Sequence, residues 1–144
     1  MIKEAKLEDA FILAKLAIEM WHSHTVEELT REFESVINFP EGVCFLKYEQ
    51  GAPIGFAQCQ LRHDYVEGTE SSPVGYLEGI FVKEAYRNKG YAKDLLEACQ
   101  DWARKCHCSE FASDCELDNE TSLRFHLRVG FTEANRIICF TKKL

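Results

Sequence analysis

A short basic turn is the first place in the sequence where chemistry could be done. Residues 86–92, YRNKGYA, separate an apolar run that ends at Val82 from a stretch with helical periodicity. The first backbone N–H groups of a helix lack intrahelical partners, and the helix dipole concentrates positive charge there. Gly90 permits close backbone approach, while Arg87 and Lys89 add full positive charge. The turn predicts a binding site for an anion such as pyrophosphate, with a solvated surface turn as the alternative.

Two acidic residues form the second candidate. Glu78 is the single charged residue in the apolar run YLEGIFV, residues 76–82, and Asp114 ends the run SEFASD, residues 109–114. Burial disfavours an ionised carboxyl unless a partner compensates it, and a cationic substrate is such a partner. Either acid could bind an ammonium or accept its proton. The alternative is structural, because acids also occur in strands and at turns.

The elements around these residues alternate between sheet and helix. Thr25 and Glu28 form a capping signature, and apolar residues recur every three or four positions from Ala92 to Cys106. The pattern predicts an α/β fold, with a mixed, mostly antiparallel sheet flanked by helices in one domain of residues 1–144. The predicted strands are 1–5, 43–49, 54–64, 76–82, 109–114 and a closing strand 136–142; the predicted helices are 7–20, 25–38, 92–106 and 119–128.

Composition narrows the class of protein. The formal net charge of −7 argues against nucleic acid and is compatible with a cationic substrate. Neither a membrane span nor a signal peptide is expected, and the seven cysteines, an odd number, indicate reduced thiols and a cytoplasmic protein. No metal site is expected, because Cys106-His107-Cys108 lacks a second group of suitably spaced ligands.

The basic turn resembles a known signature. Residues 87–92, RNKGYA, are similar to the R/Q-x-x-G-x-G/A motif with which the GNAT superfamily of N-acetyltransferases binds acetyl-CoA. Downstream, Asn119, Ser122 and His126, followed by Gly130-Phe131, resemble the second half of that family's pattern. The series RHDYV, SSPV and LEGIFV between Arg62 and Val82, together with Trp21, resembles the short, dimeric aminoglycoside 6′-N-acetyltransferases.

That resemblance implies how acetyl-CoA, a co-substrate, would be held without a metal. Backbone groups of the strand would bind the pantetheine arm and stabilise the developing oxyanion, and the basic turn would hold the pyrophosphate. The cofactor-binding residues implied are Ile80, Phe81, Val82, Arg87, Asn88, Lys89, Gly90, Tyr91, Ala92, Lys93, Asn119, Ser122 and His126.

The resemblance also implies which residues bind the substrate and accept the proton of its amine. Glu78 and Asp114 would be the catalytic, ammonium-binding carboxylates, with the base being either acid or a water relay. Trp21 and Tyr65 would line the sugar rings, although both could be half-buried structural aromatics. His126 stands where many relatives place a tyrosine that protonates the leaving thiolate, and could instead pack against the sheet. Asn135 stands where the subgroup carries an acid, at the rim of the substrate site.

The function expected from the whole sequence is transfer of acetyl from acetyl-CoA to the 6′-amine of aminoglycosides, by direct attack in a ternary complex. A homodimer is implied by the subgroup alone, and neither nucleic acid nor membrane is an expected partner. Two alternatives stay open: acetylation of another small amine such as a polyamine, and a catalytically silent acetyl-CoA-binding module.

Overall fold

A computed structural model describes all 144 residues, and it has four helices and five strands. Two short 3₁₀ turns, Leu7–Asp9 and Glu84–Tyr86, precede α1 and α3. None of the helices is long and apolar enough to cross a membrane. In chain order the elements are β1 Ile2–Glu4, α1 Ala10–Ala17, α2 Val26–Asn38, β2 Gly42–Glu49, β3 Ala52–Arg62, β4 Val74–Val82, α3 Tyr91–Lys105, β5 Phe111–Ser113 and α4 Glu120–Arg128.

The strands form one sheet in the order β1-β2-β3-β4-β5. Every neighbouring pair is antiparallel except β4 and β5, which are parallel, so the predicted mixed and mostly antiparallel sheet is confirmed. The β2–β3 turn contains Gln50 and Gly51, both with positive φ, as a tight connection requires. β4 and β5 are parallel because α3 lies between them in the chain and returns it to the same end of the sheet.

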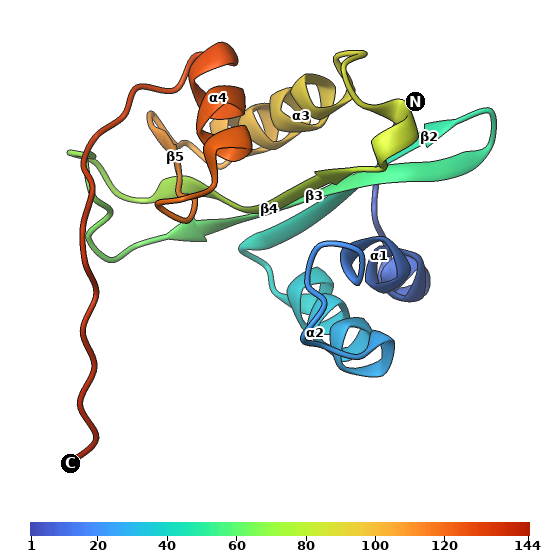
Figure 1. Cartoon of the computed structure of the whole chain (residues 1–144), viewed down its shortest axis with the longest axis horizontal. Coiled ribbons are helices and arrows are strands. Elements are labelled where there is room, and N and C mark those ends of the chain that lie inside the picture. The colour runs from blue at the N-terminus through green and yellow to red at the C-terminus, as the bar shows by residue number, and fades with distance from the viewer.

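Helices cover both faces of the sheet (Figure 1). On one face, α1 and α2 bury Leu13, Leu29 and Phe33 against Phe56 of β3 and Phe81 of β4. On the other face, α3 buries its apolar stripe against alternate residues of β2, β3 and β4. The residues of this second core are Val43, Ile54, Ala57, Cys59, Leu77, Val82, Leu95, Leu96 and Cys99.

The predicted helix 7–20 is interrupted at its end. α1 stops at Ala17, and the backbone N–H groups of Met20 and Trp21 both donate to the Ala17 carbonyl, at 2.9 and 2.8 Å. This tight turn directs the Trp21 ring onto Phe33 and Phe56, with ring centroids 6.3 and 6.1 Å apart. The end of α1 therefore positions an aromatic side chain that an uninterrupted helix would have carried further along its axis.

The predicted closing strand 136–142 is wrong for the single chain. Residues 132–144, here called the C-terminal arm, have no regular secondary structure, and the arm runs away from the sheet (Figure 1). Near its start, Asn135 Nδ2 donates to Glu67 Oε1 at 2.9 Å. Beyond that contact the backbone of the arm pairs with neither free edge of the sheet, so the β-like pattern forms no strand in the single chain.

Candidate active site

The sheet opens between β4 and β5 beside the two candidate acids. The parallel pairing joins Gly75 to Phe111 and ends where Leu77 meets Ser113. β4 continues to Val82 with no neighbour on that side, so Glu78 and Asp114 are the first residues beyond the last pair. The edge formed by residues 78–82 therefore presents backbone groups that an extended ligand could pair with, as expected for Ile80–Val82.

A β-bulge sets the direction of Glu78. Gln58 of β3 faces Gly79, but the next residue, Cys59, faces Leu77, so Glu78 is the extra residue of β4. Leu77 and Ile80 lie in the core beneath α3, whereas Glu78 and Gly79 both face Trp21 and the α1–α2 layer. Without the bulge, strict alternation would have placed Glu78 on the same face as Ile80.

A cavity of about 490 Å³ lies over this face of the sheet. It brings together Trp21 and Glu78, both of which the resemblance predicts to bind substrate, although they are 57 positions apart in the chain. The other wall, which α2 supplies, was not predicted from sequence. The available signal was the spacing of three and four residues that places Glu32, Ser35 and Val36 on one helix face. The full lining is Trp21, His24, Glu32, Phe33, Ser35, Val36, Gln58 and Glu78.

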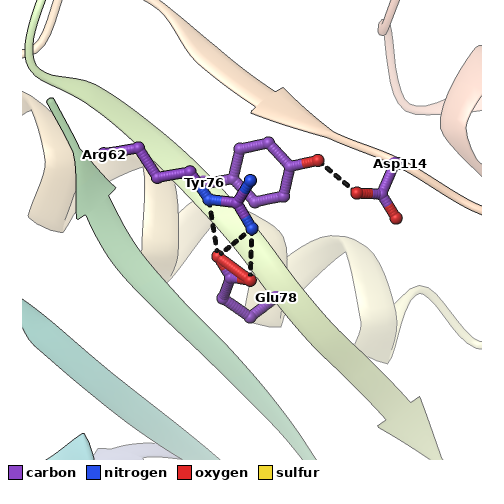
Figure 2. Close-up of polar contacts among 4 residues, drawn as sticks. All are labelled: Arg62, Tyr76, Glu78 and Asp114. Carbon is purple, nitrogen blue, oxygen red and sulfur yellow. Dashed lines mark hydrogen bonds and ion pairs between the residues drawn. The ribbon is translucent and has the colours of Figure 1, made fainter. Parts of the chain in front are cut away.

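The two candidate acids belong to one network of polar contacts (Figure 2). Arg62 donates to both carboxylate oxygens of Glu78 at 2.7–3.1 Å, and its guanidinium lies 3.4 Å above the centre of the Tyr76 ring. The Tyr76 hydroxyl in turn donates to Asp114 Oδ2. Burial and then the bond to Asp114 raise the pKa of Tyr76, so the phenol remains a donor. The structure thus connects Glu78 to Asp114 through two residues.

No role was predicted from sequence for Arg62 or Tyr76. Tyr76 stands two residues before Glu78, and this spacing was an available signal that both side chains share a face of a strand. Arg62 gave no comparable signal, because its position beside Glu78 depends on the register between β3 and β4. Tertiary structure alone therefore identifies this residue.

Two of the predicted substrate-binding residues lie together but apart from this network. The Tyr65 hydroxyl donates to Glu67 Oε2 at 3.3 Å, and Asn135 donates to the other oxygen of the same carboxylate at 2.9 Å. Neither Tyr65 nor Asn135 lines the cavity that holds Glu78. Glu67, which the sequence analysis missed, is the residue that joins them.

The basic turn has the geometry of an exposed helix start. Asn88 and Gly90 have φ of 62° and 81°, and α3 begins at the next residue, Tyr91. Arg87 Nε donates to the Val82 carbonyl at 2.8 Å, which ties the turn to the end of β4. A Cβ atom built on Gly90 meets no atom within 4 Å, so the surface above it is open. These residues fit a bound phosphate group: free N–H groups at the helix start and exposed cations beside them.

The downstream motif lies against β5. The Asn119 side chain accepts the Ser122 N–H at 3.1 Å and caps α4, so its carbonyl oxygen is already used within the chain. His126 contacts the Ser122 carbonyl through Nδ1 at 2.7 Å and Ser113 Oγ through Nε2 at 2.8 Å. The predicted motif therefore reaches the last paired residue of β5, next to Asp114.

Comparison with known proteins agrees with this geometry. The model of the acetyltransferase (GNAT) family matches residues 13–131, which include the open sheet edge, the basic turn and α4. The chain belongs to the GNAT family. An aminoglycoside N(6′)-acetyltransferase type 1 of Serratia marcescens is 38% identical over 137 residues, which are 94% of this chain and 92% of the relative.

Solved structures of aminoglycoside acetyltransferases match the whole chain. AAC(6′)-Iy in complex with the bisubstrate analogue CoA-S-monomethyl-acetylneamine is 34% identical with a TM-score of 0.96, covering 100% of this chain and 98% of the other. The aminoglycoside 6′-N-acetyltransferase AAC(6′)-Ih from Acinetobacter baumannii is 33% identical with a TM-score of 0.94, at coverages of 100% and 98%. The fold and the family that the sequence predicted are confirmed.

Proposed function

We propose that the protein transfers the acetyl group of acetyl-CoA to the 6′-amine of aminoglycoside antibiotics and so confers resistance. The observation that carries the proposal is the position of Glu78 and Asp114 at the closed end of the opening between β4 and β5. There a thioester held along β4 would meet an amine held in the cavity. The relatives named above, and the bisubstrate complex of one of them, support this substrate class.

Acetyl-CoA would be held by the residues that the sequence predicted. Backbone groups of Ile80, Phe81 and Val82 lie on the unpaired edge of β4 and would bind the pantetheine arm. The turn from Arg87 to Lys93 would bind the pyrophosphate, because the surface above Gly90 at the helix start is open and Arg87, Lys89 and Lys93 are exposed cations beside it. Asn119, Ser122 and His126 would approach the same ligand from the α4 side. When bound, acetyl-CoA supplies the activated acyl group.

The chain's own residues would deprotonate and position the amine. A cationic aminoglycoside would place its ammonium among Glu78, Asp114 and the wall of Trp21, with Tyr65 and Asn135 at the rim. One carboxylate binds the ammonium and the other accepts its proton, after which the neutral nitrogen attacks the thioester directly. A backbone N–H of the β4 edge would stabilise the charge that develops on the carbonyl oxygen.

The test is mass spectrometry of kanamycin or tobramycin incubated with acetyl-CoA and the protein. We expect one added acetyl group, located on the 6′-nitrogen and lost in the double variant Glu78→Gln/Asp114→Asn. The matched control is Glu97→Gln/Asp101→Asn, which removes two exposed acids of α3 and should retain activity. Acetylation of spermidine but not of aminoglycosides would favour the polyamine alternative. Acetyl-CoA binding without transfer to any amine would favour the silent module.

We also propose that residues 1–144 form a single domain that works in the cytoplasm as a homodimer. Seven unpaired cysteines and an intracellular co-substrate support the location.

The C-terminal arm supports the dimer, because Ile137, Ile138 and Phe140 are 62%, 78% and 87% exposed in the single chain. β5 leaves an unpaired edge at the end of the sheet, where another chain could add a strand. A second copy could also cover the apolar side chains of the arm, which nothing in the same chain covers.

A further inference from the structure

The negative charge of the Glu78 carboxylate is balanced within the chain by the Arg62 guanidinium. Arg62 Nε donates to one carboxylate oxygen at 3.1 Å, and Nη2 donates to both oxygens at 2.7 and 2.9 Å. Such two-point contacts between guanidinium and carboxylate are stronger and more directional than single hydrogen bonds. The side chain of Glu78 is only 19% exposed, so few other partners can reach it. The pair as a whole carries no net charge.

Arg62 is itself held in place from a second side. Its guanidinium lies 3.4 Å from the centre of the Tyr76 ring, which is buried among Val66 and Val74. Stacking on an aromatic face favours an arginine cation. Burial lowers and the Glu78 carboxylate raises the pKa of Arg62, and the net shift is upward. Figure 2 shows the Arg62 guanidinium between the Tyr76 ring and the Glu78 carboxylate. The cation is therefore held in the site from two sides.

Asp114 has a different environment. Its partner in the structure is the neutral Tyr76 hydroxyl, and no lysine, arginine or histidine forms an ion pair with it. The raised pKa of Tyr76 keeps the phenol protonated, so it orients Asp114 without cancelling its charge. Asp114 is exposed beyond the end of β5, so a proton accepted there can pass to solvent. Of the two acids, only Asp114 has no ion-pair partner in the chain.

We propose that Arg62 gives the two acids different tasks: it holds Glu78 as a neutralised wall of the site and leaves Asp114 to accept the proton of the substrate's ammonium. In this step the N–H bond of the ammonium breaks, an O–H bond forms on Asp114, and the nitrogen keeps the electron pair with which it attacks. Arg62 and Tyr76 are positioning residues, since they act through Glu78 and Asp114. The assignment rests on the proposed function and goes beyond it by distinguishing the two acids.

Steady-state kinetics of five variants test the assignment. Asp114→Asn removes the proton acceptor and should lower kcat by about 100-fold or more. Glu78→Gln leaves the Arg62 cation uncompensated beside the ammonium and should raise KM. The double variant Arg62→Gln/Glu78→Gln removes both charges together. Its KM should therefore fall most of the way back to the wild-type value, and its kcat should stay within about tenfold of the wild type. Arg62→Lys keeps the cation without the two-point contact, so its kcat and KM should lie between those of Arg62→Gln and those of the wild type.

Controls separate positioning from folding and from failure of the proposed function. Arg104→Gln breaks an exposed arginine–aspartate pair of α3 and should change neither constant. Thermal melts of each variant show whether it is folded. A double variant whose kcat falls as far as that of Asp114→Asn would make Glu78 the base. A lower KM with unchanged kcat in Arg62→Gln would mean that the substrate displaces Arg62. Either result overturns the assignment.

If the wild type acetylates no aminoglycoside, the proposed function fails, and the same series is run with spermidine.

Discussion

Glu78 and Gly79 are consecutive residues of β4, yet both face the layer formed by α1 and α2. The bulge opposite Gln58 and Cys59 produces this arrangement, because it gives β4 one extra residue between Leu77 and Gly79. Glu78 thereby enters the cavity, and Gly79 leaves room for the indole of Trp21 beside it. The bulge, one local irregularity in the sheet, thus positions both the Trp21 wall of the cavity and the Glu78 carboxylate.

Gly79→Ala should disturb this wall. A Cβ atom at residue 79 would lie 3.0 Å from Trp21 Cζ2, closer than carbon atoms normally pack, so the indole must move. We expect KM for kanamycin to rise several-fold while the Kd for acetyl-CoA stays unchanged, measured by steady-state kinetics and calorimetry. Trp21→Phe removes the indole atoms that clash, so Gly79→Ala should have a smaller additional effect in that background. Equal effects in both backgrounds would show that the alanine acts elsewhere.

Gly90→Ala should weaken acetyl-CoA binding. Gly90 has φ of +81° and open space above it, where a phosphate would approach the start of α3. Gly51, in the β2–β3 turn, has φ of +78° and equally open surroundings. Both alanine variants carry a similar backbone strain of about 1 kcal/mol, so Gly51→Ala is a matched control. We expect only Gly90→Ala to raise the Kd for acetyl-CoA; parallel losses in both variants would contradict a phosphate site at this turn.

Removing residues 136–144 should change assembly more than folding. Every fully buried residue lies between Ala5 and Ala103, so the truncation removes no part of the core. We expect a small change in Tm and conversion of a dimer to a monomer, measured by light scattering after size-exclusion chromatography. The control Lys142→Ala/Lys143→Ala keeps the apolar side chains of the arm and should remain dimeric. A monomeric full-length protein would contradict the proposed homodimer.

The seven thiols should react in a fixed order. Burial raises the pKa of Cys44 to about 12, and burial also raises the pKa values of Cys106 and Cys108. A raised pKa means less of the reactive thiolate at a pH near 8, so these thiols should alkylate slowly. Cys115 is exposed and should react first, whereas Cys139, exposed in the single chain, should react more slowly in the proposed dimer because a second copy would cover the arm. Timed alkylation with iodoacetamide, followed by peptide mass spectrometry, gives the order; early labelling of Cys44 would show that the core opens readily.

The sequence by itself determined most of the local structure. The capping signature at Thr25 and Glu28 begins α2, where the Thr25 hydroxyl accepts the Glu28 N–H at 3.1 Å. Periodicity located α3, and the basic turn before it was visible because helix starts and glycine have local signals in the chain. The family also followed from sequence, since its motifs are short and contiguous.

Only the tertiary structure decided which side chains meet. Strict alternation places Glu78 on the face of Ile80, and the bulge that turns it toward Trp21 arises from the register with β3. The Arg62–Glu78 contact depends on the same register, because the two residues are 16 positions apart and lie on different strands. The apolar pattern of residues 136–142 has no partner strand within the chain. Local sequence specifies helix starts and strand propensity, whereas register and partner depend on free energies summed over whole faces of the sheet.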